Sequence, residues 1–179
     1  MASRFSRLLR IMGYSVYDTD SEAKRLMESS LEVVQKLSEC FGRDIYHNGR
    51  LNRGLLSSRV FGESDKIVLL NSIVHPVVRF DFYRWSESLN EEICFVESAI
   101  LYESRFDELV DEVWTVTAPE ELRIGRVRQR SGLTEEEIKK RMAAQLSEEE
   151  KQRRAAHIIW NDGNVSVIHR VLSLLKSLE

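Results

Sequence analysis

The chain reads VWTVTAPEELRIGRVRQR over residues 113–130, and this passage from a strand into a helix decides the fold class. The first four residues are mostly apolar, as expected for a strand that is buried in a parallel sheet. Thr117 and Glu120 have the spacing of a capping box, and Pro119 suits the first turn of a helix. The sequence therefore predicts a strand at 113–116 that leads directly into a helix.

Strands and helices alternate on both sides of this passage. Further strands are expected at residues 14–17, 93–96 and 158–160. Capping signals and apolar spacing predict helices at 1–12, from Thr19, at 31–41, 53–61 and 64–74, from His75-Pro76 to about 89, from Thr134, from Ser147, and at 165–178. This alternation predicts an α/β fold with a mainly parallel sheet, into which the all-helical stretch of about 30–90 is inserted.

The composition excludes several classes of protein. The 179 residues include 26 Lys and Arg against 29 Asp and Glu, so no global positive field draws the chain to nucleic acid or anionic lipid. No apolar run reaches the roughly 20 residues that cross a membrane. Cys40 and Cys94 lack metal-ligand spacing, and we expect buried thiols in a reducing cytoplasm. Residues 1–12 have the composition of a transit peptide, but we take them as the start of the folded domain because a predicted strand follows.

Three carboxylates follow predicted strands. Asp18 and Asp20 come after the strand at 14–17, and Glu97 comes after the strand at 93–96. Ligands of parallel α/β sheets bind at the carboxyl ends of strands, so these groups suit metal binding or general-base work. The alternative is that Asp18 and Asp20 are ordinary turn and cap residues, since Asp is favoured there.

Basic residues gather after the strand at 113–116. The helix carries Arg123, Arg126, Arg128 and Arg130, and Lys139, Lys140 and Arg141 follow. Arginine forks bind phosphate in a bidentate manner, but the many acids nearby make a solvated helix face the alternative. His75 precedes a proline at a predicted helix start, where a histidine more often caps or packs than catalyses.

Four segments, taken in order, resemble the dephospho-coenzyme A kinases. They are GYSVYDTDSEAKRL (13–26), LNRGLLSSRVFGESDKIVLLNSIVHPVV (51–78), VESAILYES (96–104), and the stretch 111–163 that ends in Asn161-Asp162-Gly163. No single motif is specific, but their ordered combination over about residues 7–164 is. The resemblance implies a three-layer P-loop kinase fold whose core, 1–30 and 91–179, carries a lid at about 126–156. Residues 31–90 would then form a helical domain that binds the coenzyme A substrate.

The resemblance also implies the reaction and its residues. Members transfer the γ-phosphoryl group of ATP to the ribose 3′-hydroxyl of dephospho-coenzyme A, and Mg²⁺ accompanies ATP. Asp20 would act beside that hydroxyl and could hold the Mg²⁺. The substrate side would include Arg53, His75 and Glu97. Arg130 and Arg141 would face the transferring phosphates, while Arg126 and Asn161 would bind the nucleotide.

The chain departs from the family at the phosphate loop. Members begin with a strand and a glycine-rich loop, but no G-x-x-x-x-G-K-[ST] occurs in these 179 residues, and none of the 8 glycines precedes a lysine. Asn52, Ala99 and Ala156-His157 also replace the usual Asp, Pro and Ala-Asp. Met1 falls about where the residue after the loop is expected, so the first strand and the loop are expected to be missing.

Three explanations for this departure stay open. They are a start codon assigned too far downstream, an artificially shortened chain, and a natural relative that has lost catalysis. We favour the first two, because the remaining motifs look like those of a working enzyme. We expect little kinase activity from the chain as printed. The exposed sheet is expected to be closed by a neighbouring chain, as in a homo-oligomer, to be closed by rearrangement of residues 1–17, or to be left as a gap.

Two other functions remain as alternatives. The first is a non-catalytic module that binds coenzyme A or a partner through the helical domain. The second is a kinase of the same fold that acts on a nucleotide or a shikimate-like substrate.

Overall fold

The structure is a computed structural model that describes residues 4–164 and 166–178. The predicted helix starts at residues 1 and 165 lie outside these described residues. The chain divides into two compact units, Met1–Ser98 and Ala99–Glu179. Each unit combines helices with one pair of parallel strands, so the predicted α/β class with parallel strands is confirmed.

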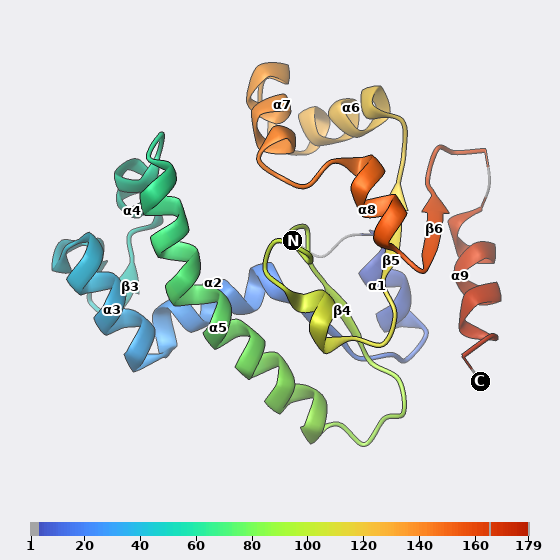
Figure 1. Cartoon of the computed structure of the whole chain (residues 1–179), viewed down its shortest axis with the longest axis horizontal. Helices are drawn as coiled ribbons and strands as arrows, with labels where there is room; N and C mark the ends of the chain where they lie inside the picture. The colour runs from blue at the N-terminus through green and yellow to red at the C-terminus, as the bar shows by residue number, and fades with distance from the viewer. Residues whose placement is uncertain (1–3, 165, 179) are drawn as a thin grey trace. The chain divides into compact units, whose positions relative to one another are not determined.

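The first unit is mainly helical (Figure 1). Its parallel pair joins β1 (Val16–Asp18) to β4 (Phe95–Glu97), and Asp18 lies opposite Glu97 in the register. Two more strands, β2 (Tyr46–His47) and β3 (Arg50–Leu51), form a short antiparallel hairpin. The other elements are α1 (Arg4–Ile11), α2 (Thr19–Ser29), α3 (Leu31–Phe41), a 3-10 turn (Arg43–Ile45), α4 (Arg53–Val60) and α5 (Ser64–Ser88).

Helix α5 corrects one prediction. His75-Pro76 was expected to begin a new helix, but α5 continues without a break from Ser64 to Ser88 with Pro76 inside it. An interior proline removes one backbone hydrogen bond and costs about 3 kcal/mol. Apolar side chains before and after Pro76 are buried, and each contributes about 1.5–3 kcal/mol. Burial of one continuous apolar face therefore outweighs the local preference, and that face comprises Ile73, Val74, Val78 and Phe82.

The second unit builds a helical excursion between two parallel strands. β5 (Trp114–Thr117) pairs with β6 (His157–Trp160), and the backbone N–H of Asn161 donates to the carbonyl of Thr117 at 2.7 Å to extend the ladder. The fully buried Ile159 and Val171 belong to its core. Its other elements are a 3-10 turn (Phe106–Leu109), α6 (Glu120–Ser131), α7 (Glu135–Ala143), α8 (Glu148–Arg154) and α9 (Val167–Leu175).

Two predicted helix caps are wrong in detail. Asp18, not Thr19, caps α2 by accepting from the Ser21 N–H at 3.1 Å, because Thr19 donates its hydroxyl to the Glu97 carbonyl instead. Thr117 ends β5 and does not cap α6, whose N-terminal position is Pro119. In contrast, the capping box of α7 between Thr134 and Glu137 is confirmed.

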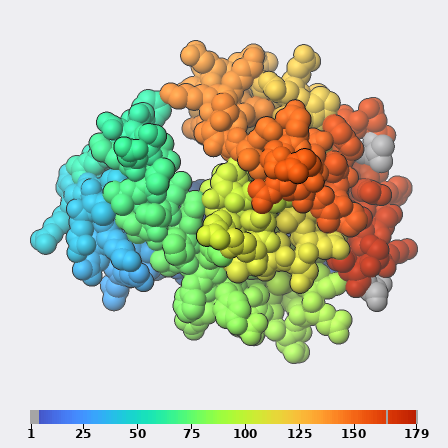
Figure 2. Space-filling model, viewed as in Figure 1, coloured from blue at the N-terminus to red at the C-terminus, as the bar shows by residue number. Residues whose placement is uncertain are grey.

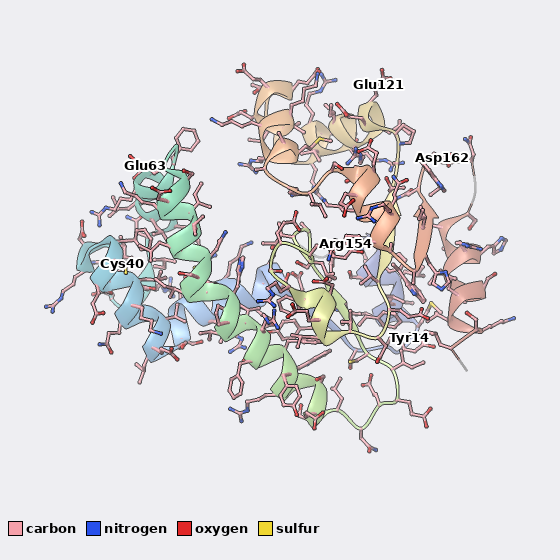
Figure 3. All side chains as sticks on the ribbon, viewed as in Figure 1. Tyr14, Cys40, Glu63, Glu121, Arg154 and Asp162 are labelled. Carbon is pink, nitrogen blue, oxygen red and sulfur yellow. The ribbon has the colours of Figure 1, made fainter. Side chains whose placement is uncertain are left out.

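The thiol of Cys40 corrects another expectation. Cys40 on α3 is exposed (Figure 3), whereas Cys94 is half-buried, so the expectation of two buried thiols is wrong for Cys40. Among the described residues, no helix is both long and apolar enough to cross a membrane.

Candidate active site

The strand-end carboxylates of the first unit differ in what holds them. Asp18 is committed to capping α2, as the conservative alternative predicted. Glu97 accepts a hydrogen bond from the buried hydroxyl of Ser6 on α1. Asp20, the second residue of α2, is exposed, and its carboxylate has no hydrogen bond or ion pair with any described residue. Asp20 therefore differs from the other two carboxylates, each of which already accepts a hydrogen bond within the protein.

The site offers little protein chelation for a metal. Within residues 4–164 and 166–178, no group of three or more His, Cys, Asp or Glu side chains is placed to hold an ion. Mg²⁺ that accompanies a nucleotide is commonly bound through one or two carboxylates together with phosphate oxygens. The exposed carboxylate of Asp20 fits that limited role, and a protein-only metal cage does not fit these residues.

Arg53 and His75 lie on neighbouring helices of the first unit, α4 and α5. Arg53 begins α4, pairs with Glu28 at 3.0 Å and donates to the Lys24 carbonyl at 3.4 Å, so α2 fixes its orientation. His75 is half-buried in α5, and burial lowers its pKa. No hydrogen bond or ion pair in the described part of the chain joins either side chain to Asp20.

The lowered pKa of His75 predicts a pH effect on stability. The unfolded chain binds a proton at His75 near pH 6.5, whereas the folded chain does so only at lower pH. The contribution of neutral His75 should be complete above about pH 7 and should fall as the pH drops through 6.5. Urea unfolding at pH 7.5 and 5.5 should show a smaller acid loss of stability in His75→Gln than in the parent.

The exposed His47 provides the control for this effect. His47→Gln should leave the acid loss unchanged. An acid loss that is equal in the parent and in His75→Gln would show that His75 does not cause it.

One cluster that positions α2 was missed from the sequence. The hydroxyl of Tyr17 on β1 donates to Asp81 on α5 at 2.7 Å, and burial raises the pKa of this hydroxyl. Arg25 on α2 bridges Asp81 at 2.7 Å and Glu22. The i, i+3 spacing of Glu22 and Arg25 was a visible signal, but nothing local marks Asp81, which is 56 residues away from Arg25.

The second unit brings two predicted nucleotide-binding residues together. Arg126 on α6 donates from Nη1 to the backbone carbonyl of Asn161 at 2.7 Å, across 35 residues of sequence. Asn161 follows β6 and begins the loop that contains Asp162, which is labelled in Figure 3. Their contact places one guanidinium beside the carboxyl end of a parallel strand, where ligands of such sheets bind.

Arg130 and Arg141 lie on two helices that pack against each other, α6 and α7, and both side chains are exposed. Figure 2 shows these helices, in yellow-orange and orange, side by side on one face of the molecule. Arg130 has no hydrogen bond or ion pair to a described residue, while Arg141 helps to lower the pKa of Glu137 after the larger effect of the Thr134 N–H. Two arginine side chains on adjoining helices can together bind a polyanion such as a chain of phosphates.

Similarity to known proteins identifies the family. The family model for dephospho-CoA kinase matches residues 2–166. Proteins named dephospho-CoA kinase from Porphyromonas gingivalis and Bacteroides fragilis are 36% and 37% identical over 174 residues, which cover 97% of this chain and 86% and 85% of those proteins.

Solved structures agree. TT1252 from Thermus thermophilus matches with a TM-score of 0.84 and 33% identity over 97% of this chain and 88% of that one. Dephospho-CoA kinase from Campylobacter jejuni matches in fold, with a TM-score of 0.70 and 23% identity over 98% of this chain and 92% of that one. The chain of 179 residues therefore has the fold of a P-loop kinase, and it belongs to the dephospho-CoA kinase family.

Proposed function

We propose that the chain binds dephospho-coenzyme A and ATP and transfers the γ-phosphoryl group to the ribose 3′-hydroxyl. Membership of the family implies ATP-dependent phosphorylation of a small molecule. The observation that carries the detailed proposal is the carboxylate of Asp20, which is exposed in the first turn of α2, two residues after the end of β1, and has no partner among the described residues.

Asp20 would orient the 3′-hydroxyl and accept its proton as the hydroxyl oxygen bonds to the γ-phosphorus and the bond from that phosphorus to the bridging oxygen breaks, which releases ADP. Asp20 would also be a ligand of Mg²⁺, which neutralises phosphate charge when it is bound with ATP. Phosphoryl transfer depends mainly on positioning and charge neutralisation, so one free carboxylate is chemically sufficient on this side.

The remaining site residues divide between the two substrates. We assign Arg53, His75 and Glu97 to dephospho-coenzyme A, with Ser6 and Glu28 holding two of these side chains. Arg126 and the Asn161 segment would bind ATP, and Arg130 and Arg141 would neutralise charge on the transferring phosphates.

The proposed domains follow the same division. Residues 31–90 would hold dephospho-coenzyme A, and 1–30 with 91–179 would hold ATP, with 126–156 as the lid. The exposure of α6 and α7 supports a lid role. The proposal also places the enzyme in the cytoplasm, where ATP is available, and gives it no nucleic-acid partner. Cell fractionation and sedimentation would test the location and the expected homo-oligomer.

A substrate panel tests the proposed function. Calorimetry on the chain should show binding of dephospho-coenzyme A that is at least tenfold tighter than binding of AMP or shikimate. A coupled ADP-release assay, run on the chain extended by a strand and a glycine-rich phosphate loop, should show transfer to dephospho-coenzyme A.

Each alternative has its own outcome. Transfer to AMP or shikimate but not to dephospho-coenzyme A would identify a kinase of another specificity. Tight binding of dephospho-coenzyme A without transfer by the extended chain would identify a binding module.

A further inference from the structure

Polar contacts in the second unit form a closed ring around Glu148. Glu148 accepts from the Thr117 hydroxyl at 2.9 Å and pairs with Arg123 Nη1 at 2.7 Å. One turn further along α6, Arg126 donates to the Asn161 carbonyl at 2.7 Å. The N–H of Asn161 donates to the Thr117 carbonyl at 2.7 Å, which returns to the first residue. We call these five residues the Glu148 ring.

The Glu148 side of the ring is shielded from water. Thr117 is 2% exposed, and the side chains of Arg123 and Glu148 are 24% and 22% exposed. Lys151 adds a second cation 3.8 Å from the same carboxylate. A charge pair in such surroundings interacts more strongly than a surface pair, and removal of one partner strands the other. This side of the ring is therefore its rigid part.

The opposite side of the ring is open to solvent. Arg126 is exposed, and it is held on the protein through the backbone carbonyl of Asn161. Both oxygens of Glu148 are already used, one by Thr117 and one by Arg123. Glu148 is therefore held by protein partners on both oxygens, and the role that follows from this is to act on a ligand through the other members of the ring.

We propose that Glu148 is a positioning residue for the nucleotide, which fixes α6 against the end of β5 so that Arg126 and Asn161 present one preformed surface. This inference rests on the proposed function, which assigns Arg126 and Asn161 to ATP. Glu148 is the first residue of α8 and is held there by Thr117 and Arg123, so its carboxylate anchors α6 to the end of β5. Without the Glu148 carboxylate, the first turn of α6 is no longer held in place. The distance between Arg126 and Asn161 can then vary.

Two substitutions at Glu148 and one at its neighbour test this role. In the chain extended by a strand and a glycine-rich phosphate loop, Glu148→Ala should weaken ADP binding about tenfold in calorimetry, the factor expected for about 1.4 kcal/mol of lost positioning. Glu148→Gln should recover most of the affinity, because the amide oxygen still accepts from Thr117 or Arg123. Glu149→Ala removes an exposed acid from the same turn of α8 and should change nothing. The affinity for dephospho-coenzyme A should stay within twofold in all three variants.

The outcomes separate this inference from the proposed function. A proportional loss of both affinities in Glu148→Ala would indicate general destabilisation and would overturn the positioning role. Failure of the extended parent chain to bind ADP would instead count against the proposed nucleotide site. Amide hydrogen exchange then tests whether Glu148 holds the ring together. In Glu148→Ala, exchange should become faster over residues 120–131 and at Asn161. It should not change over residues 135–143. Unchanged exchange at all of these amides would refute the ring.

Discussion

A polypeptide of residues 1–179 should phosphorylate dephospho-coenzyme A at least about 10³-fold more slowly than the same residues preceded by a strand and a G-x-x-x-x-G-K-[ST] loop. In P-loop enzymes that loop supplies a lysine and backbone N–H groups to the phosphates and a hydroxyl to Mg²⁺. Loss of one preorganised donor to developing charge costs about 10²–10³ in rate, and this loop contributes several.

The coupled ADP-release assay measures both polypeptides under the same conditions. A third polypeptide, with the loop lysine replaced by alanine, keeps the added strand and thus separates the chemistry of the loop from stabilisation of the sheet. It should remain close to the slow rate. Equal turnover by the 179-residue chain and the extended chain would show that residues 1–179 alone form the phosphate-binding site.

Local sequence predicted the elements better than their junctions. The β5–α6 passage was recognised because an apolar run meets helix-forming residues, and the α7 capping box was recognised because both of its partners are local. The predicted break at Pro76 is wrong because burial on both sides of the proline is a property of the folded unit. Thr117 looked like a cap but ends a strand, since its hydroxyl finds Glu148 31 residues later.

The same physical reason limited the prediction of the site. The contact of Arg126 with Asn161 depends on the parallel pairing of β5 with β6, which local spacing does not encode. Glu148 is one of three consecutive acids at the start of α8, and the sequence makes them look equivalent. Only the packing of α8 beside β5 makes Glu148 half-buried while Glu149 stays exposed.

Asp20→Asn in the extended chain should lower kcat by about 10²–10⁴-fold, the range for loss of a general base, and should change KM for dephospho-coenzyme A less than about threefold. Asparagine keeps the size and hydrogen-bonding shape of the side chain but cannot accept the proton of the 3′-hydroxyl. We expect neither Asp18 nor Glu97 to replace it, since Asp18 caps α2 and Glu97 accepts from Ser6.

The matched control is Asp65→Asn, because Asp65 is also the exposed second residue of a helix, α5. Both variants lose a negative charge in the first turn of a helix, whose interaction with the helix dipole contributes about 0.3–1 kcal/mol to stability. Their thermal unfolding temperatures should therefore shift by similar amounts. Only Asp20→Asn should lose turnover, and its loss should appear in kcat. If the two variants retain equal kcat, Asp20 is a helix-terminal acid like Asp65, and the proton must leave the 3′-hydroxyl by another route.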